Sequence, residues 1–253
     1  IGFVSAGGTE RKLFNMIFGA ILAGGVGSRM IIADRPKQFL QLGDKPIIVH
    51  TLEKFLLCSR LDRVYVGVHP NWLLHMQDLL DKYVPDQKDM VTLVPGGGDR
   101  NNTIMNIASQ IEKDFGESDD HIIVTHDSVR PFVTMRIIEE NIDAALQYGA
   151  VDTVIEATDT IVVSEDAKII TEIPNRKKMF QGQTPQSFNL KLLKELYNDL
   201  TDEEKGILTD ACKICVVRNK PVHLVRGEVS NLKITTISDY KIAQAMIGGN
   251  AIG

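Results

Sequence analysis

Residues 17–30 read Ile-Phe-Gly-Ala-Ile-Leu-Ala-Gly-Gly-Val-Gly-Ser-Arg-Met, an apolar run that passes directly into a glycine-rich loop. The run Ile17–Leu22 has the length and composition of a buried strand. Glycines in the loop that follows let the backbone approach an anion closely and direct its N–H groups at the oxygens. A strand that ends in such a loop predicts a phosphate-binding site. A glycine turn between solvated charges is the alternative.

Downstream of this loop, short apolar runs alternate with stretches of helical spacing. Strands are predicted at 17–22, 64–68, 91–94, 122–126, 150–157 and 222–225, and helices at 47–57, 72–83, 103–115, 135–148, 191–200 and 238–246. This alternation predicts an α/β fold with a mainly parallel, Rossmann-like sheet and helices on both faces. Ligands of such sheets bind at the carboxyl ends of the strands, which directs attention to the loops after Leu22, Val94 and Val124.

Residues 158–178 interrupt the alternation. Two short apolar runs, Thr160–Val163 and Lys168–Ile173, flank the polar stretch 164–167. This pattern predicts a β-hairpin arm that stands off the main sheet. Because an isolated hairpin is only marginally stable in water, we expect the arm to pack against a second subunit and to form a homodimer.

The ends and the composition set outer limits. Residues 1–15 lack the basic start and apolar core of a secretory signal, so we interpret them as a leader or extension before a single domain at 16–253. The net charge of −5 argues against nucleic acid as a partner. No apolar run approaches the ~18–20 residues that cross a bilayer.

Three cysteines are compatible with a cytoplasmic protein. Cys212 and Cys215 form a C-x-x-C pair, which is found in redox-active and zinc sites. No second pair is present, and the flanking sequence has helical spacing. We therefore interpret both residues as ordinary thiols and keep redox or metal chemistry as the alternative.

Cationic residues accompany the first loop. Arg29 and Lys37 can neutralise a triphosphate that the acidic chain would otherwise repel. Met30 occupies the place of the last glycine in a dinucleotide-binding G-x-G-x-x-G, and the P-loop pattern is also absent. The loop therefore favours phosphate binding of another kind.

The string L-A-G-G-x-G-S-R-M, followed by Pro-Lys-Gln at 36–38, resembles the signature loop of the sugar-nucleotidyltransferase superfamily. The resemblance runs from Phe18 to Met246 and is closer to the cytidylyltransferases that form CDP-linked alcohols. It implies that CTP reacts with an alcohol phosphate in the presence of Mg²⁺. It also implies that Arg29 and Lys37 stabilise charge on the α-phosphate. The triphosphate would be wrapped by Ala23, Gly24, Gly25 and Gly27.

The second loop, residues 96–103, reads Gly-Gly-Gly-Asp-Arg-Asn-Asn-Thr. Glycines before a helix predict a cradle for a flat base, although a helix cap at Asn101 or Asn102 accounts for part of the pattern. The resemblance implies that cytosine is held here. Its pocket would be formed by Gly97, Gly98, Asp99 and Thr103.

The third loop, His-Asp-Ser-Val-Arg-Pro at 126–131, follows the fourth strand. Asp127 can hold Mg²⁺ against phosphate oxygens, and Arg130 can bind the substrate phosphate. A lone aspartate at a strand end is more often a cap, but the whole string is far more specific. The resemblance places Asp127 beside the metal and the alcohol phosphate, and we assign Ser128 to the CTP pocket. We interpret His126 as structural.

Later segments complete the expected site. The resemblance implies that Thr160 and Arg176, on the arm, reach into the partner's active site and grip the substrate phosphate. Lys233 supplies a further cation for the α-phosphate or the substrate. Thr-Pro-Gln at 184–186 is interpreted as a positioning turn.

Acceptor choice rests on small departures from the family pattern. Enzymes that use methylerythritol phosphate usually have two alanines where this chain has Ser128 and Val129. This difference, the second loop's Asp-Arg-Asn-Asn-Thr at 99–103 and Ala-Thr-Asp-Thr-Ile at 157–161 more closely resemble the enzymes that use D-ribitol 5-phosphate, which we therefore favour, with 2-C-methyl-D-erythritol 4-phosphate as the alternative. A dinucleotide-dependent oxidoreductase and a CTP sensor without turnover are the rival classes. The missing glycine argues against the first, and the set Arg29, Lys37, Asp127 and Lys233 against the second.

Overall fold

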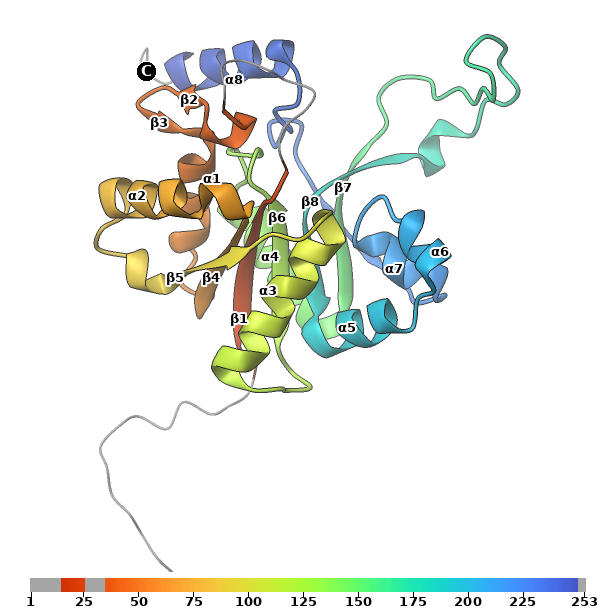
Figure 1. Ribbon diagram of the computed structural model, residues 1–253. Helices are drawn as coiled ribbons and strands as arrows, with labels where there is room; N and C mark the ends of the chain where they lie inside the picture. The colour runs from red at the N-terminus through yellow and green to blue at the C-terminus, as the bar shows by residue number, and fades with distance from the viewer. Residues whose placement is uncertain (1–14, 26–34, 250–253) are drawn as a thin grey trace, which may run out of the picture.

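The computed structural model describes residues 15–25 and 35–249, and its centre is a seven-stranded sheet with the order β5-β4-β1-β6-β8-β7-β9 (Figure 1). The strands are β1 (Ile17–Ala23), β4 (Arg63–Val68), β5 (Val91–Pro95), β6 (Ile122–Asp127), β7 (Ala150–Glu156), β8 (Phe180–Asn189) and β9 (His223–Arg226). A small antiparallel pair, β2 (Gln41–Leu42) and β3 (Lys45–Pro46), lies apart from this sheet.

Most neighbouring strands of the sheet are parallel. β1 pairs in parallel with β4 and β6, β4 with β5, and β7 with β9, whereas β8 is antiparallel to both β6 and β7. The predicted α/β architecture with a mainly parallel sheet is therefore confirmed. In the register of β1 and β6, Leu22 lies beside Asp127, so the first and third loops leave the sheet at the same edge.

Helices cover both faces of the sheet, and alternate side chains of β1 explain why. Ile17 and Ile21 belong to one apolar core and Phe18 and Leu22 to the other, as the two-residue period of a strand requires. The first core is closed by α1 (Ile47–Leu56), α2 (Leu73–Tyr83) and α4 (Met135–Tyr148). The second is closed by α3 (Arg100–Phe115), α5 (Leu190–Asn198) and α7 (Cys212–Val217).

The remaining helices are peripheral. α6 (Asp202–Gly206) is a short surface helix, and α8 (Ile237–Gly249) lies over β2 in a third apolar cluster that includes Leu42 and Ala243. Short 3-10 turns are η1 (Lys37–Phe39), η2 (Pro70–Trp72), η3 (Lys88–Met90) and η4 (Arg176–Lys178).

Two local predictions were wrong. α3 begins at Arg100 rather than at Thr103, because the side chain of Asp99 caps the helix by accepting from the backbone N–H of Asn102 (2.7 Å). The expected cap at Asn101 or Asn102 is therefore replaced by Asp99. Residues 184–186, expected to form a turn, lie inside β8. A strand was not expected there because polar residues and a proline break the apolar pattern.

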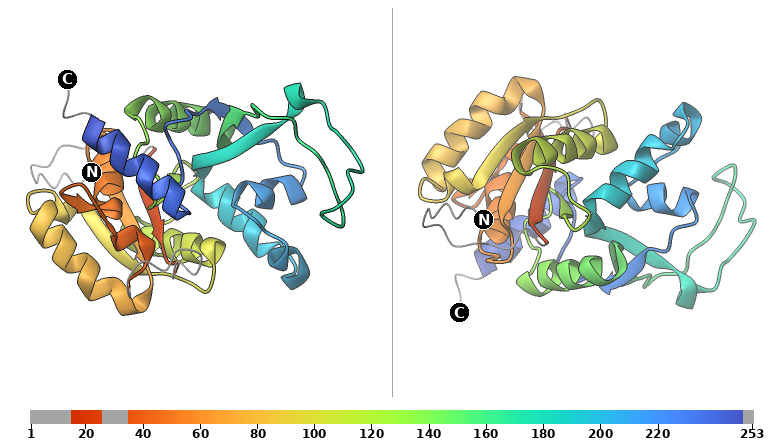
Figure 2. Two further views of the ribbon diagram at one scale, coloured as in Figure 1. Left: turned by 90° about the horizontal axis from the view of Figure 1, so that it is seen from above. Right: turned by 90° about the horizontal axis from the view of Figure 1, so that it is seen from below.

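The arm at 158–178 extends away from the body, on the far side from α2 (Figures 1 and 2). Instead of two paired strands it contains a single isolated bridge, Val163 to Glu172. A two-stranded ribbon gains little stability without a further strand or helix to cover it. Several of the arm's apolar side chains are exposed, namely Val162, Val163, Ile169, Ile170 and Ile173.

The cysteines behave as core residues. Cys58, Cys212 and Cys215 are free and buried, and the last two lie on α7 against the second core. Burial raises the pKa of Cys215 to about 11 and that of Cys212 well above its usual value, so both thiols stay protonated near neutral pH. Across 15–25 and 35–249, no group of three or more His, Cys, Asp or Glu side chains is arranged to hold a metal.

Residues 1–14 of the expected leader lie outside the part of the chain that the structure describes. Within the described residues, no helix is both long enough and apolar enough to traverse a bilayer.

Candidate active site

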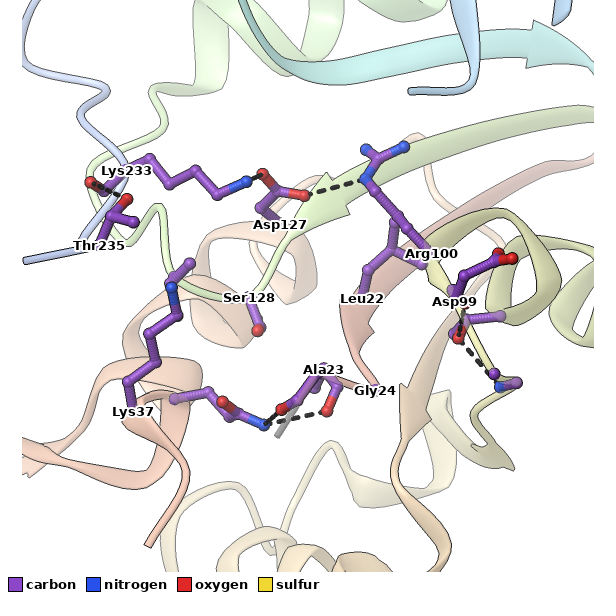
Figure 3. Close-up of a pocket in the computed structure, with 16 residues that line it drawn as sticks. Leu22, Ala23, Gly24, Lys37, Asp99, Arg100, Asp127, Ser128, Lys233 and Thr235 are labelled. Atoms are coloured by element: carbon purple, nitrogen blue, oxygen red, sulfur yellow. Dashed lines mark hydrogen bonds and ion pairs between the residues drawn. The ribbon is translucent and has the colours of Figure 1, made fainter. Parts of the chain in front are cut away.

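A cavity of about 440 Å³ opens at the edge of the sheet where β1 and β6 end (Figure 3). It is walled by the three loops that the sequence singled out and by the segment around Lys233. The predicted site residues that line it are Ala23, Gly24, Gly25, Lys37, Gly97, Gly98, Asp99, Thr103, Asp127, Ser128 and Lys233. Segments as far apart in the chain as Leu22 and Thr235 are thus brought to one cavity.

The other predicted site residues lie elsewhere. Thr160 and Arg176 are exposed on the arm, where Nη1 of Arg176 donates to the carbonyl of Thr158 (2.8 Å). Arg130 is buried and does not line the cavity. Gly27 and Arg29 fall outside the described residues.

Gln38 holds the first loop in place, although no role was predicted for it beyond its membership of the Pro-Lys-Gln string. Its buried side chain donates from Nε2 to the carbonyls of Ala23 (3.0 Å) and Gly25 (3.1 Å). These two bonds hold the glycine loop against η1, on which Lys37 is carried. Gln38 therefore couples the backbone of the loop to the position of its lysine.

Thr103 organises the second loop. Its Oγ1 accepts from the backbone N–H of Gly97 (3.0 Å) and donates to the carbonyl of Asp99 (2.9 Å). A Cβ atom on Gly24 would lie 2.9 Å from this oxygen, and one on Gly97 would lie 2.4 Å from Cβ of Asn102. Both glycines are required because the first and second loops approach α3 too closely for a side chain.

Asp127 lies at the centre of the third loop among three cations. Nζ of Lys233 lies 2.8 Å from Oδ2, Nε of Arg100 donates to Oδ1 (3.2 Å), and Nε of Arg130 lies 3.8 Å from Oδ2. Lys233 and Arg100 approach the carboxylate from opposite sides (Figure 3). Burial alone would raise the pKa of Asp127, but these charges outweigh it and hold the pKa well below its usual value.

Arg100 was not predicted as a site residue, although it follows Asp99 directly in the second loop. Its side chain reaches from the start of α3 to the third loop and lines the cavity. The signal that could have identified Arg100 is its place directly after the glycines of the second loop. Its partner on a distant strand is visible only in three dimensions.

His126 is structural, in agreement with its interpretation from sequence. It is fully buried, and burial lowers its pKa to about 4, so the ring is neutral. Because the carbonyl of Arg130 can only accept, Nε2 donates to it (3.1 Å), and Nδ1 accepts from Oγ1 of Thr184 (2.9 Å). Thr184 Oγ1 in turn accepts from the backbone N–H of Asp127 (3.1 Å). β8 thereby anchors the third loop.

Asn231 anchors the segment that carries Lys233. Its Nδ2 donates to the carbonyl of Thr184 (2.8 Å), and its own carbonyl accepts from Nη1 of Arg130 (2.7 Å). Arg130 is therefore committed to holding this segment against Asp127. The structure gives it a supporting position behind the cavity, and contact with a substrate phosphate remains a prediction.

This arrangement suits a polyphosphate ligand. Glycine-rich backbone lines one part of the cavity, and Lys37 and Lys233 provide positive charge across it. Mg²⁺ is usually held by one or two carboxylates together with phosphate oxygens, and a single ionised Asp127 fits that pattern. The cavity can bring anionic groups together and neutralise them.

Comparison with known proteins agrees with this geometry. Residues 17–249 match the family described as IspD, 2-C-methyl-D-erythritol 4-phosphate cytidylyltransferase. The match covers the whole sheet and all four segments that wall the cavity.

Solved structures of similar fold carry related descriptions. A 4-diphosphocytidyl-2C-methyl-D-erythritol synthase from Anaerococcus prevotii is 24% identical, with a TM-score of 0.75, over 92% of this chain and 99% of that one. The 2-C-methyl-D-erythritol 4-phosphate cytidylyltransferase from Thermus thermophilus is 25% identical, with a TM-score of 0.66, over 90% of this chain and 97% of that one. The enzyme of the same name from Francisella tularensis is 23% identical, with a TM-score of 0.73, over 90% of this chain and 98% of that one. The chain therefore belongs to the 2-C-methyl-D-erythritol 4-phosphate cytidylyltransferase family and is a CTP-dependent nucleotidyltransferase.

Proposed function

We propose that this enzyme transfers the cytidylyl group of CTP to 2-C-methyl-D-erythritol 4-phosphate and releases pyrophosphate. The observation that supports this most directly is the family match over residues 17–249, which spans a cavity lined by Lys37, Asp127 and Lys233. The family match favours this acceptor over D-ribitol 5-phosphate, which the third loop had suggested.

The surroundings of Val129 support the same choice. Its side chain is 4% exposed and packs with Leu42, Ile47 and Ile234 in the apolar cluster beneath α8. Packing accounts for the size of this residue, and Val129 also lines the cavity beside Ser128. Both departures from the alanine pair therefore face the site, and they keep D-ribitol 5-phosphate as the second candidate.

The reaction needs alignment of two anions rather than a strong base. The phosphate oxygen of the acceptor attacks the α-phosphorus of CTP in line, the bond from that phosphorus to the β-phosphate oxygen breaks, and pyrophosphate leaves. A phosphate monoester is already anionic near neutral pH. Lys37 and Lys233 would offset the repulsion between the reactants and the charge that develops on the α-phosphate.

Asp127 would be the residue that holds Mg²⁺. Its low pKa keeps the carboxylate ionised throughout the neutral range, which a cation site requires. When bound, the cation would supply positive charge that neutralises part of the charge of the leaving group. The backbone N–H groups around Gly24 and Gly97 would hold the nucleotide against this side of the cavity.

The arm would complete the site by forming a homodimer. Thr160 and Arg176 lie outside the cavity of their own chain, and the arm exposes apolar side chains such as Ile169 (67%) and Ile173 (61%). An exposed apolar arm of this kind gains stability by packing against a second copy. In that assembly, Thr160 and Arg176 of one chain would contact the acceptor phosphate in the partner's cavity.

One assay tests the acceptor. The purified protein is incubated with CTP, MgCl₂ and either 2-C-methyl-D-erythritol 4-phosphate or D-ribitol 5-phosphate, and pyrophosphate release and the CDP-alcohol are measured. We expect the higher kcat/KM for the methylerythritol compound, and a large but measurable fall in the rate of formation of both products with Asp127→Asn. A higher kcat/KM for the ribitol compound reverses the choice of acceptor.

A further inference from the structure

Arg100 has a position that the proposed chemistry does not use. It is the first residue of α3, and its side chain crosses from the second loop to donate from Nε to Oδ1 of Asp127 (3.2 Å). Lys233 holds the other carboxylate oxygen (2.8 Å). Figure 3 shows the two cations on opposite sides of Asp127. The carboxylate is thus held at both oxygens by residues from different segments.

The two cations differ in how readily they can move. The side chain of Lys233 is 43% exposed, and that of Arg100 is 24% exposed. A lysine ammonium is a hydrated point charge on a flexible stem, whereas a guanidinium is a rigid planar fork. Lys233 can therefore leave Oδ2 and turn to a phosphate in the cavity. Arg100 is the better placed of the two to remain.

The hydrogen bonding of Arg100 is unfavourable for a purely structural residue. Its Nη1 and Nη2 atoms are buried, and within the described part of the chain neither has a hydrogen-bond partner. A buried donor left in this state destabilises the fold, because it loses its hydrogen bond to water without gaining one in the protein. Arg130 also has one buried nitrogen without a partner, Nε, but its Nη1 donates to the carbonyl of Asn231, whereas both Nη atoms of Arg100 are unpartnered. Stability alone does not account for an arginine at position 100.

We propose that Arg100 is a positioning residue for Asp127. Its hydrogen bond holds Oδ1 in a fixed direction. The ammonium of Lys233 can then move from Oδ2 to the phosphates, while the carboxylate keeps its orientation toward Mg²⁺ and the reactants. The inference rests on the role proposed above for Asp127, and it is independent of which alcohol phosphate is the acceptor.

The test compares Arg100→Met with Arg100→Lys and with Arg60→Met. The control removes an exposed pair, Arg60 with Asp143 (2.7 Å), that does not line the cavity. We expect Arg100→Met to lower kcat and the affinity for Mn²⁺ in the presence of CTP by about 10–100-fold, with KM for CTP and the melting temperature near wild type. Arg100→Lys should recover part of the loss, and Arg60→Met should change none of these values.

A double-mutant cycle with Asp127→Asn separates positioning from structure. If Arg100 acts through Asp127, Arg100→Met has no further effect on kcat once Asp127 is replaced. The proposal is overturned if the losses of kcat caused by Arg100→Met and Asp127→Asn are additive in the double variant. It is also overturned if the melting temperature of Arg100→Met falls together with its activity. Should Arg100→Met fail to fold, wild-type rate and Mn²⁺ affinity in Arg100→Lys overturn it, because any cation would then suffice. Mn²⁺ titration with CTP alone requires no acceptor, so it decides the role of Arg100 even if the acceptor assignment fails.

Discussion

Nζ of Lys233 lies 2.8 Å from Oδ2 of Asp127, although the two residues come from different loops and are separated by 106 positions in the chain. The lysine thus neutralises the carboxylate at the edge of the cavity. A ligand phosphate that enters the cavity competes with Asp127 for the same ammonium. The positive charge of Lys233 can therefore pair either with Asp127 or with a phosphate of the ligand.

Replacing Lys233 tests this arrangement. Lys233→Met should lower kcat by about 10²–10³-fold, because it removes a cation aimed at the charge of the transition state. The melting temperature should change little, since the side chain is 43% exposed. Steady-state kinetics and thermal unfolding provide the measurements. Lys88→Met, which breaks an exposed pair with Asp81 away from the cavity, is the matched control. Equal kcat in the two variants would exclude a catalytic part for Lys233.

Mixed dimers test whether the arm serves the partner's cavity. Lys37→Ala and Arg176→Ala should each inactivate the homodimer. In a dimer with one chain of each variant, one cavity has both defects and the other has neither. Random exchange of chains should therefore restore roughly a quarter of the wild-type activity. The activity is measured after the two inactive proteins have been unfolded together and refolded. Failure of the mixture to regain activity would argue that Arg176 acts within its own chain, and full activity of Arg176→Ala alone would show that it has no part in the reaction.

Gly97 tests the close approach of the second loop to α3. Gly97→Ala would place Cβ 2.4 Å from Cβ of Asn102 and force the loop to move. Because small displacements of a binding loop have large effects on rate, we expect about 100-fold lower kcat/KM for CTP. Gly206→Ala serves as control, since a Cβ there meets nothing within 4 Å. Unchanged kinetics in Gly97→Ala would show that the loop adapts without loss.

Asp152 links stability to pH. Burial raises its pKa to about 6, from about 3.9 in an unfolded chain. The ionised form therefore destabilises the fold above pH 6, and this cost vanishes below the unfolded pKa, where the carboxyl is protonated in both states. Asp152→Asn should raise the free energy of unfolding by about 2–3 kcal/mol at pH 8 and by almost nothing near pH 4. Urea denaturation at both pH values measures the difference.

The exposed Asp86→Asn is the matched control for this effect. It should leave the free energy of unfolding nearly unchanged at both pH values. If Asp152→Asn raises the free energy of unfolding by the same amount at pH 4 and at pH 8, its effect comes from packing rather than from charge.

Much of the fold could be predicted because the strands around β1 are apolar runs of ordinary length. Ile122–Asp127 and Arg63–Val68 are continuous and buried, and periodicity finds such segments. β8 was not predicted because its stretch from Gln181 to Gln186 is polar and is interrupted by a proline. The part from Gln183 onward is buried, and its polar groups are satisfied by hydrogen bonds such as that from Thr125 to the carbonyl of Gln186. The arm was predicted as a hairpin because its local pattern alternates, but a ladder needs a supporting neighbour.

The cavity was predicted where strand ends coincide with unusual loops. Residue type and spacing are enough to predict the glycines, Lys37 and Asp127 as site residues. Gln38 and Arg100 do not, since their roles depend on backbone carbonyls and a carboxylate that only the folded chain brings near. Arg130 is conspicuous beside Asp127 in the sequence, but its hydrogen bond to the carbonyl of Asn231 is visible only in the folded chain, and its contact with a substrate phosphate remains a prediction.

β8 has a further consequence for how the gene can change. The strand starts at Phe180, where the arm ends, and Thr184 turns its hydroxyl toward His126 and the backbone of Asp127. Successive side chains of a strand point to opposite faces. Deleting or inserting one codon between 180 and 184 would put the pairs that Phe180–Gly182 form with β7 out of register with Thr184, whereas the same edit at the tip of the arm, near Asp166, leaves this alignment intact. The length of the arm can therefore vary between related sequences, whereas the number of residues between Phe180 and Thr184 should stay constant.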